Sequence, residues 1–251
     1  MEPTGGAAIV VMQILDDLIA GLDGNAPVKD IRQGVFHTAV FTRCCGLAAT
    51  LPRDALCQAP PMVNEPGSLL EKEPLQLVRM AYSDSILEAA IGVAAINSLI
   101  EVDLNACRER NAAEMILEKG KGRNVAIVGH FPFIPRIRKA AKTLWVIDKN
   151  PQEGDFSETD AVDLIPEAEV VAITGSALTN HTMPYLLGLC DPKAYVLALG
   201  DSVPMSPVLF DYGLNAVCGS LVVDPDLAMK CVSQGGNFRQ IRGVMRLSMT
   251  R

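Results

Sequence analysis

The sequence lacks the features that mark several broad classes of protein. No apolar run approaches the roughly 20 residues that a membrane-spanning helix needs. The net charge is −7, and no cluster of Lys and Arg suits a nucleic-acid backbone. Residues 1–21 have helical apolar spacing and carry Glu2 where a signal peptide would be positive. We therefore expect a cytoplasmic protein with no nucleic-acid or membrane partner.

Familiar metal and catalytic motifs are missing as well. The seven cysteines contain no C-x-x-C pair, which argues against a zinc ribbon, and their odd number argues against a disulfide framework. No G-x-S-x-G elbow and no phosphate-binding P-loop are present. No close pair of carboxylates resembles a glycosidase dyad. Most of the cysteines are therefore expected to be small buried hydrophobic residues, and no motif identifies a reaction.

The first part of the chain predicts a small α+β domain. A helix is expected over 7–21, a proline-rich loop over 52–68, and helices over 69–80 and 83–100. Three short runs of strand formers predict an antiparallel meander, namely 28–32, 35–41 and 46–50. Asn97 lies within an apolar helix, where it either makes a structural hydrogen bond or contacts a ligand. With a linker near 101–105, the first domain spans 1–104.

The second part, 105–251, alternates strands with helices. After a helix expected over 106–119, apolar strands are predicted at 124–129, 143–148, 170–175 and 194–200, with a fifth at 214–218. Strands that are apolar throughout, alternating with helices, predict a parallel sheet covered on both faces. The fold class is therefore α/β, an α+β domain followed by a doubly wound domain.

Each strand of the second part is followed by a loop that carries polar side chains. Because the carboxyl ends of parallel strands meet at one edge of the sheet, where such folds bind ligands, these loops are expected to surround one site. The four loops are 129–133, 148–151, 174–181 and 200–207.

The first two loops invite comparison with dinucleotide-binding proteins. Asp148 follows Gly129 by 19 residues, near the spacing of a ribose-binding acid. The dinucleotide motif needs three glycines, however, and only Gly129 is present. His130 and Phe131 place bulk where the backbone should approach a pyrophosphate. The sequence therefore disfavours a dinucleotide and leaves a nucleotide in another pose open.

Only three histidines are present, and two of them lie on the predicted ligand face. His37 is expected to be a half-exposed residue of a strand in the first domain, unless that strand borders the cleft. If His130 and His181 face one cleft, with Asp148 or Asp201 nearby, they can ligate a metal or shuttle protons. Imidazole and carboxylate groups suit divalent Zn, Ni, Co or Fe, whose identity the sequence does not fix. Each histidine alone is more often a structural residue than a ligand.

Taken together, the loops resemble a known family. The segments GHFPF (129–133), TGSALTNHT (174–182) and GDSVPMSPVLFDYG (200–213), with GVFHTAV (34–40) and GLAATL (46–51), resemble the heavy-metal-chelation family of domain-of-unknown-function proteins. Members pair an enolase-N-terminal-like domain with a Rossmann-like domain. The resemblance implies this architecture for 1–104 and 105–251. It also implies binding of a heavy metal between the domains, linked to corrinoid or similar metal-cofactor metabolism.

The resemblance also implies a set of site residues. The matching positions are Thr38, Gly46, Asn97, His130, Phe131, Asp148, Thr174, Gly175, Ser176, Asn180, Gly200 and Ser202. This chain departs from the family pattern at Asp148, where glutamate is common, at His181, where glycine is common, and at Asp201, where proline is common. The last two departures add polar groups to the expected cleft.

These observations leave three hypotheses. In the first, the interdomain cleft binds a heavy metal or a metal-bearing small molecule, with His130, His181 and Asp148 as metal ligands and Thr174, Ser176, Asn180 and Ser202 holding oxygens or phosphate. In the second, the chain is an enzyme that acts on a nucleotide or other small cofactor without metal, with His130 as the acid/base. In the third, the pocket binds a ligand but turns nothing over. A homodimer is expected as the commonest assembly.

Overall fold

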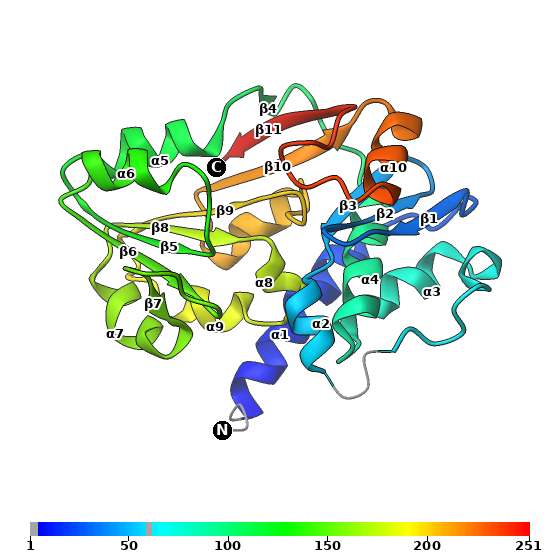
Figure 1. Ribbon diagram of the computed structural model, residues 1–251, viewed down its shortest axis with the longest axis horizontal. Helices are drawn as coiled ribbons and strands as arrows, with labels where there is room; N and C mark the ends of the chain where they lie inside the picture. Colours follow the sequence, from blue (N-terminus) through cyan, green and yellow to red (C-terminus); the bar gives the residue numbers. More distant parts are fainter. Residues whose placement is uncertain (1–4, 59–61) are drawn as a thin grey trace.

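The apolar runs of the second part form the centre of a parallel sheet. The computed structural model describes residues 5–58 and 62–251. The central strands are β5 (Asn124–Val128), β6 (Thr143–Asp148), β8 (Val170–Thr174), β9 (Tyr195–Leu199) and β10 (Ala216–Val222). Three further strands lie outside them, β4 (Cys107–Arg108), β7 (Phe156–Ser157) and β11 (Val244–Thr250). The order across the eight-stranded sheet is β4-β11-β10-β9-β8-β5-β6-β7 (Figure 1).

In this order, the point at which successive strands change from one side of β5 to the other lies between β5 and β8. From β5 the chain runs outward through β6 to β7, then returns to the other side of β5 and runs outward through β8, β9 and β10. All of these pairs are parallel, whereas β11 is antiparallel to both β10 and β4. The order of the parallel strands is that of the Rossmann fold. The predicted α/β class with a mostly parallel sheet is therefore confirmed.

Helices cover both faces of this sheet because successive strand residues point to opposite sides. Val125 and Ile127 of β5 pack with α5 (Ala112–Gly120) and α6 (Ile134–Ala140), whereas Ala126 packs into a larger cluster on the other face. That larger cluster includes residues of α1 (Gly5–Ala20), α7 (Ala161–Leu164), α8 (Ser176–Thr179) and α9 (Met183–Gly188). Burial on both faces explains why the strands contain no alternating polar residues.

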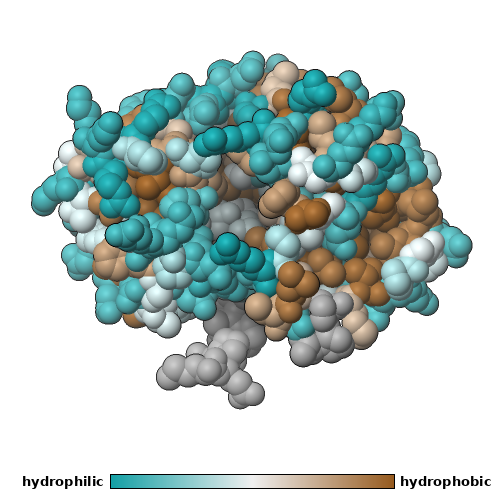
Figure 2. All heavy atoms as spheres, in the orientation of Figure 1, coloured by the Kyte–Doolittle hydropathy of each residue, from teal (hydrophilic) through white to brown (hydrophobic). Residues whose placement is uncertain are grey.

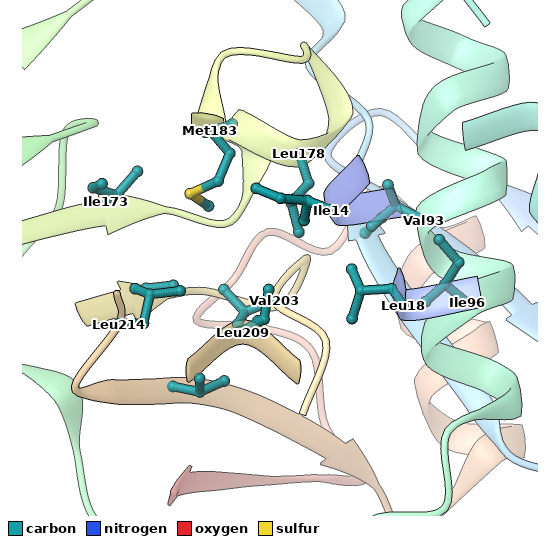
Figure 3. Packing of buried hydrophobic residues seen from close by; sticks show 14 of the residues in the cluster. Ile14, Leu18, Val93, Ile96, Ile173, Leu178, Met183, Val203, Leu209 and Leu214 are labelled. Carbon is teal, nitrogen blue, oxygen red and sulfur yellow. The ribbon is translucent and has the colours of Figure 1, made fainter. Parts of the chain in front are cut away.

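The larger cluster joins the two parts of the chain. Ile14 of α1 and Ile96 of α4 (Ile86–Leu99) belong to the same buried cluster as Leu178 of α8 and Leu209 of η5 (Pro207–Tyr212), and Figure 3 shows these side chains together. Apolar burial contributes about 25 cal/mol per Å². The apolar surface that the two parts bury against each other in this cluster therefore stabilises their arrangement. The division into domains 1–104 and 105–251 remains a prediction.

A small antiparallel sheet makes up the rest of the first part. Its strands β1 (Asp30–Gln33), β2 (His37–Phe41) and β3 (Cys45–Ala49) pair in chain order, as the predicted meander requires. Helix α4 covers one face, and α10 (Pro225–Ser233) from the end of the chain packs against the other. Gly46 allows the close approach of α4, since a Cβ at this position would lie 2.1 Å from the carbonyl oxygen of Ala94.

Several predicted elements differ from those in the structure. Part of the predicted loop 52–68 is α2 (Pro52–Cys57), because proline is well tolerated in the first helical turn. Pro60 and Pro61 of that loop lie outside the described residues. The helix predicted over 106–119 begins only at Ala112, where the side chain of Asn111 caps it. Strands β7 and β11 were not predicted, because their polar residues interrupt the apolar pattern.

The remaining elements are short. The segment predicted as one helix over 69–80 divides into η1 (Leu69–Glu71) and α3 (Pro74–Arg79), followed by η2 (Met80–Tyr82). The segment after β7 contains η3 (Glu158–Asp160), α7 and η4 (Ile165–Glu167). Asp224 caps α10 and accepts a hydrogen bond from the backbone N–H of Leu227 at 3.0 Å.

The surface and the helices bear on the membrane prediction. None of the helices in the described segments combines the length and apolar character needed to cross a bilayer. On the face shown in Figure 2 most side chains are hydrophilic, and the hydrophobic ones gather mainly over the part that carries β1–β3 and α4. The cytoplasmic location and the homodimer remain predictions.

Candidate functional site

A large cavity lies at the carboxyl edge of the parallel sheet. It encloses about 1200 Å³, more than the usual 300–1000 Å³ of a small-molecule pocket. The ends of β5, β6, β8 and β9 form one wall, and Phe36, Ala49 and Leu51 of the first part contribute another. The cavity therefore lies between the small sheet and the parallel sheet. We call it the edge cavity.

The four predicted loops all reach the edge cavity. Their placement follows from the parallel pairing of β5, β6, β8 and β9, which brings the carboxyl ends of these strands to one edge. The predicted site residues that line the cavity are His130, Phe131, Asp148, Thr174, Gly175, Ser176, Asn180, Gly200, Asp201 and Ser202. Their binding roles remain predictions.

Glycine is required where β5 turns into the cavity wall. Gly129 has φ of +103°, a conformation that residues with a Cβ rarely adopt. A Cβ there would lie 3.1 Å from the Phe131 ring and 3.1 Å from Cβ of Thr174. The ring of Phe131 stacks on Phe133 with centroids 5.2 Å apart. The space above this turn is thus filled by aromatic side chains.

His130 is held by a carboxylate. Its Nδ1 lies 2.8 Å from Oδ2 of Asp155, whose side chain is only 3% exposed. The Asp155 carboxylate also accepts the backbone N–H of Gln152 at 3.2 Å. If the bridging proton is on Nδ1, Nε2 is left as the basic nitrogen of His130. An imidazole oriented in this way suits either a metal ligand or an acid/base group.

Asp148 lies at the end of β6 and is half-buried. Its Oδ1 accepts the backbone N–H of Asn150 at 2.8 Å. Within residues 5–58 and 62–251, Oδ2 takes part in no hydrogen bond or ion pair. The neighbouring Lys149 instead faces Asp54 of α2, with Nζ 3.6 Å from Oδ2. Asp148 therefore presents one open acceptor at the edge cavity.

Hydroxyl and amide groups of the third loop bond to one another. Thr174 Oγ1 and Ser176 Oγ are 2.9 Å apart. Asn180 Oδ1 accepts the hydroxyl of Thr182 at 2.7 Å. These bonds fix the orientation of the polar groups along the cavity wall, and a preordered site needs such fixed groups.

A buried charged cluster links the two sheets beside the cavity. The Asp201 carboxylate lies 3.2 Å from Nε2 of His37 on β2 and 3.3 Å from Nη1 of Arg246 on β11. The atoms in these two contacts are close but are not aligned as hydrogen bonds. Both carboxylate oxygens of Asp201 are therefore without a hydrogen-bond partner among the described residues. Burial opposes ionisation, but His37 and the charge of Arg246 outweigh it and hold the pKa of Asp201 below its ordinary value. The acid is therefore ionised at neutral pH.

His37 follows the alternative, in which its strand borders the cleft. The residue is not half-exposed but 6% exposed, and it lines the edge cavity. Packing of the small sheet against the parallel sheet buries it, and strand alternation within β2 carries no information about that packing.

Three predicted ligand residues have structural contacts. The amide of Asn97 donates to the carbonyl of Leu47 at 2.8 Å, and Ser202 Oγ accepts the backbone N–H of Ala49 at 2.8 Å. Thr38 is fully buried, with its hydroxyl 3.1 Å from that of Thr50. Ser202 also lines the edge cavity, whereas Thr38 and Asn97 are not part of its described wall. These contacts connect β3, α4 and the loop after β9.

His181 faces a different cavity. Its Nε2 lies 2.7 Å from the carbonyl oxygen of Ala81, and the residue lines a neighbouring cavity of about 480 Å³. Among the described side chains, no three His, Cys, Asp or Glu residues are close enough to hold a metal ion. The predicted ligands His130, His181 and Asp148 are therefore not gathered into one metal centre, because His181 points toward η2.

The sequence did not predict several residues of the cavity wall, or Asp155, which contacts the wall residue His130. Arg246 was missed because β11 was not predicted, and Asp155 because it lies in a polar loop. Arg246 also stacks on Phe238, with its guanidinium carbon 4.5 Å from the ring centre. Further basic residues of the wall are Arg110, Arg136 and Arg239. No local signal distinguishes these arginines from surface residues.

Comparison with known proteins gives one consistent result. A family model, DUF364, described as "Putative heavy-metal chelation", matches residues 111–251. A second model with the same description, DUF4213, matches residues 15–100. An uncharacterized protein of Methanocaldococcus jannaschii is 27% identical over 167 residues, which is 64% of this chain and 64% of that relative's length.

Two solved structures share the fold. A DUF364-family protein of unknown function from Desulfitobacterium hafniense matches with a TM-score of 0.83 and 24% identity, over 97% of this chain and 100% of that one. Another from Pyrococcus horikoshii matches with a TM-score of 0.80 and 20% identity, over 98% and 99% of the two chains. At these identities the likeness concerns the fold alone.

Proposed function

Because the chain belongs to the DUF364 family, we propose that the edge cavity binds a heavy metal carried by a small organic molecule. The observation that carries the proposal is the convergence of four strand ends on one cavity of about 1200 Å³. Ligand sites favour such strand ends and the spaces between packed parts of a chain.

The donor set does not fit a bare metal ion held by protein groups alone. Structural metal sites use about four protein ligands and catalytic sites about three, and the described side chains provide no such group. His130 is the best single ligand, since Asp155 can hold its Nδ1 proton and orient Nε2. A metal whose other positions are filled by an organic chelate needs only one such protein ligand.

The lining of the cavity suits an organic chelate. Phe131 and Phe133 supply aromatic surface, and Arg136 and Arg239 supply positive charge. In a protein of net charge −7, these arginines offer local sites for carboxylate groups on a ligand. A link to corrinoid-like cofactor metabolism, which the family resemblance implies, belongs to this proposal as well.

Spectroscopic titration tests the proposal. Purified apo protein is titrated with hemin and with cobinamide, and absorption spectra report binding. In separate experiments, calorimetry measures the binding of free Co²⁺, Ni²⁺ and Zn²⁺. We expect a metal macrocycle to bind with a Kd in the micromolar range and the free ions to bind more weakly. His130→Ala should abolish the spectral change caused by imidazole coordination. Binding weaker than about 1 mM for every probe, roughly −4 kcal/mol, would sink the proposal.

A second function is favoured by the His130–Asp155 pair. A carboxylate-oriented imidazole at the wall of a cavity is also the arrangement of a general acid/base. In this alternative the protein is an enzyme that acts on a nucleotide or another small cofactor without metal. A thermal-shift panel of nucleotides, S-adenosylmethionine and tetrapyrroles, with and without chelator, separates the two. Stabilisation by a nucleotide that chelator leaves unchanged favours the enzyme.

A further inference from the structure

Asp148 has an acceptor that the protein leaves open. Its Oδ1 is fixed by the N–H of Asn150, and Oδ2 has no partner within the described part of the chain. No cation lies within ion-pair distance in those residues, since the adjacent Lys149 is paired with Asp54. A half-buried carboxylate with one fixed and one open oxygen is poised to accept hydrogen bonds from a ligand in the edge cavity.

The place of Asp148 in the sheet narrows the kind of ligand. It ends β6, the strand beside β5, and the order of the parallel strands reverses direction between β5 and β8. In sheets with this order, an acid about 20 residues beyond the first turn accepts the hydroxyls of a ribose. Asp148 follows Gly129 by 19 residues and lines the same cavity as that turn.

The phosphate-binding part of such a site is absent from the turn. A dinucleotide needs open backbone over the glycine turn so that the pyrophosphate can approach. Here the ring of Phe131 lies 3.1 Å from the position of a Cβ at Gly129, and His130 is engaged with Asp155. The turn therefore offers an aromatic surface in place of a phosphate cradle.

We propose that Asp148 binds the vicinal hydroxyls of a nucleoside-type ligand that places no pyrophosphate at the Gly129 turn. The inference rests on the proposed use of the edge cavity as a ligand site, and it names the chemical class of the ligand. A carboxylate accepts two hydroxyl protons at once, and such charge-assisted bonds are stronger than neutral ones. The stacked rings of Phe131 and Phe133 line the same cavity and provide aromatic surface for a base.

The test compares ligands that differ only in the two hydroxyls. Binding of adenosine, guanosine, cytidine and uridine to the full chain is measured by calorimetry, beside their 2′,3′-dideoxy counterparts. We expect at least one ribonucleoside to bind and its dideoxy form to bind about 10- to 100-fold more weakly. NAD should bind no more tightly than that ribonucleoside, because the turn has no room for its pyrophosphate.

Substitution of Asp148 assigns the effect to one carboxylate. In Asp148→Asn the ribonucleoside and its dideoxy form should bind with equal, weak affinity. Asp163→Asn makes the same change on the exposed surface of α7 and should keep the wild-type preference. Circular dichroism confirms that both variants are folded.

The outcomes distinguish this inference from the proposed function. The absence of any ribonucleoside binding, or equal affinity of wild type for both forms, overturns the inference. Tighter binding of NAD overturns its exclusion of a pyrophosphate. None of these results depends on metal. If hemin or cobinamide binds wild type but not His130→Ala, the proposed function holds even when the nucleoside assignment fails. The reverse outcome is equally distinguishable.

Discussion

The Asp201 carboxylate lies 3.2 Å from Nε2 of His37, although the two residues are 164 positions apart in the chain. His37 is on the small sheet and Asp201 follows β9 of the parallel sheet. The contact thus fastens the two sheets beside the edge cavity. Arg246 from β11 adds a positively charged partner to the same carboxylate.

Asp201→Asn should destabilise the protein at neutral pH and much less in acid. The folded-state pKa of Asp201 is lowered, so its carboxylate stabilises the fold above the ordinary carboxyl pKa of about 3.9. That contribution is lost as the pH falls through the lower folded-state pKa. Removal of one partner from a buried ion pair costs about 3–5 kcal/mol. Urea unfolding at pH 7 and at successive acidic pH values measures the difference.

The corresponding control is Asp211→Asn, which changes an exposed acid on η5. Its effect should stay within about 0.5 kcal/mol at each pH. If the difference between wild type and Asp201→Asn were the same at pH 7 and well below pH 3.9, the charge of Asp201 would not be the stabilising feature.

Asp155→Asn should weaken binding of the metal macrocycle without unfolding the chain. The carboxylate holds Nδ1 of His130 at 2.8 Å, and loss of such a supporting group typically reduces metal affinity about 10- to 100-fold. Optical titration with hemin or cobinamide measures the change, with Asp163→Asn as the surface control. Unchanged affinity in Asp155→Asn would show that the pair is only structural.

Gly46→Ala should lower the free energy of unfolding by about 1–3 kcal/mol, since overpacking a close contact has this cost. Its Cβ would lie 2.1 Å from the carbonyl oxygen of Ala94, so α4 must move away from β3. Gly188→Ala is the matched control, because a Cβ there meets nothing within 4 Å in the described structure. The control should change stability by no more than about 1 kcal/mol. Equal effects in both variants would contradict a steric cause.

The buried cysteines should resist alkylation in the native protein. Burial raises the pKa of Cys45 to about 12, and burial likewise raises the pKa of Cys218 to about 12. The thiolate is the reactive form, so both should remain unmodified by iodoacetamide at pH 8. Cys57 is exposed and should react first. Mass spectrometry of peptides before and after unfolding follows each site, and early labelling of Cys218 would contradict the prediction.

The parallel sheet was predictable because its strands are apolar throughout. Runs such as 125–127 and 170–173 are buried on both sides, and burial on both faces leaves a continuous apolar signal in the sequence. The strand β11 carries Arg246 and Ser248 and gives no such signal. The helix α2 was missed because its proline, which often signals a loop, here begins a helix.

The candidate site was also predictable only in part from the sequence. The sequence by itself determined that polar loops follow the strands, and parallel pairing then required the loops to share one edge. Only the tertiary structure decided which side chains face the edge cavity. In the structure, packing of the small sheet places His37 at the edge cavity, whereas His181 lines a neighbouring cavity. His130 contacts Asp155 through Nδ1. Local pattern records burial and hydrogen bonding along one element, whereas these contacts depend on how distant elements pack, which no short stretch of sequence encodes.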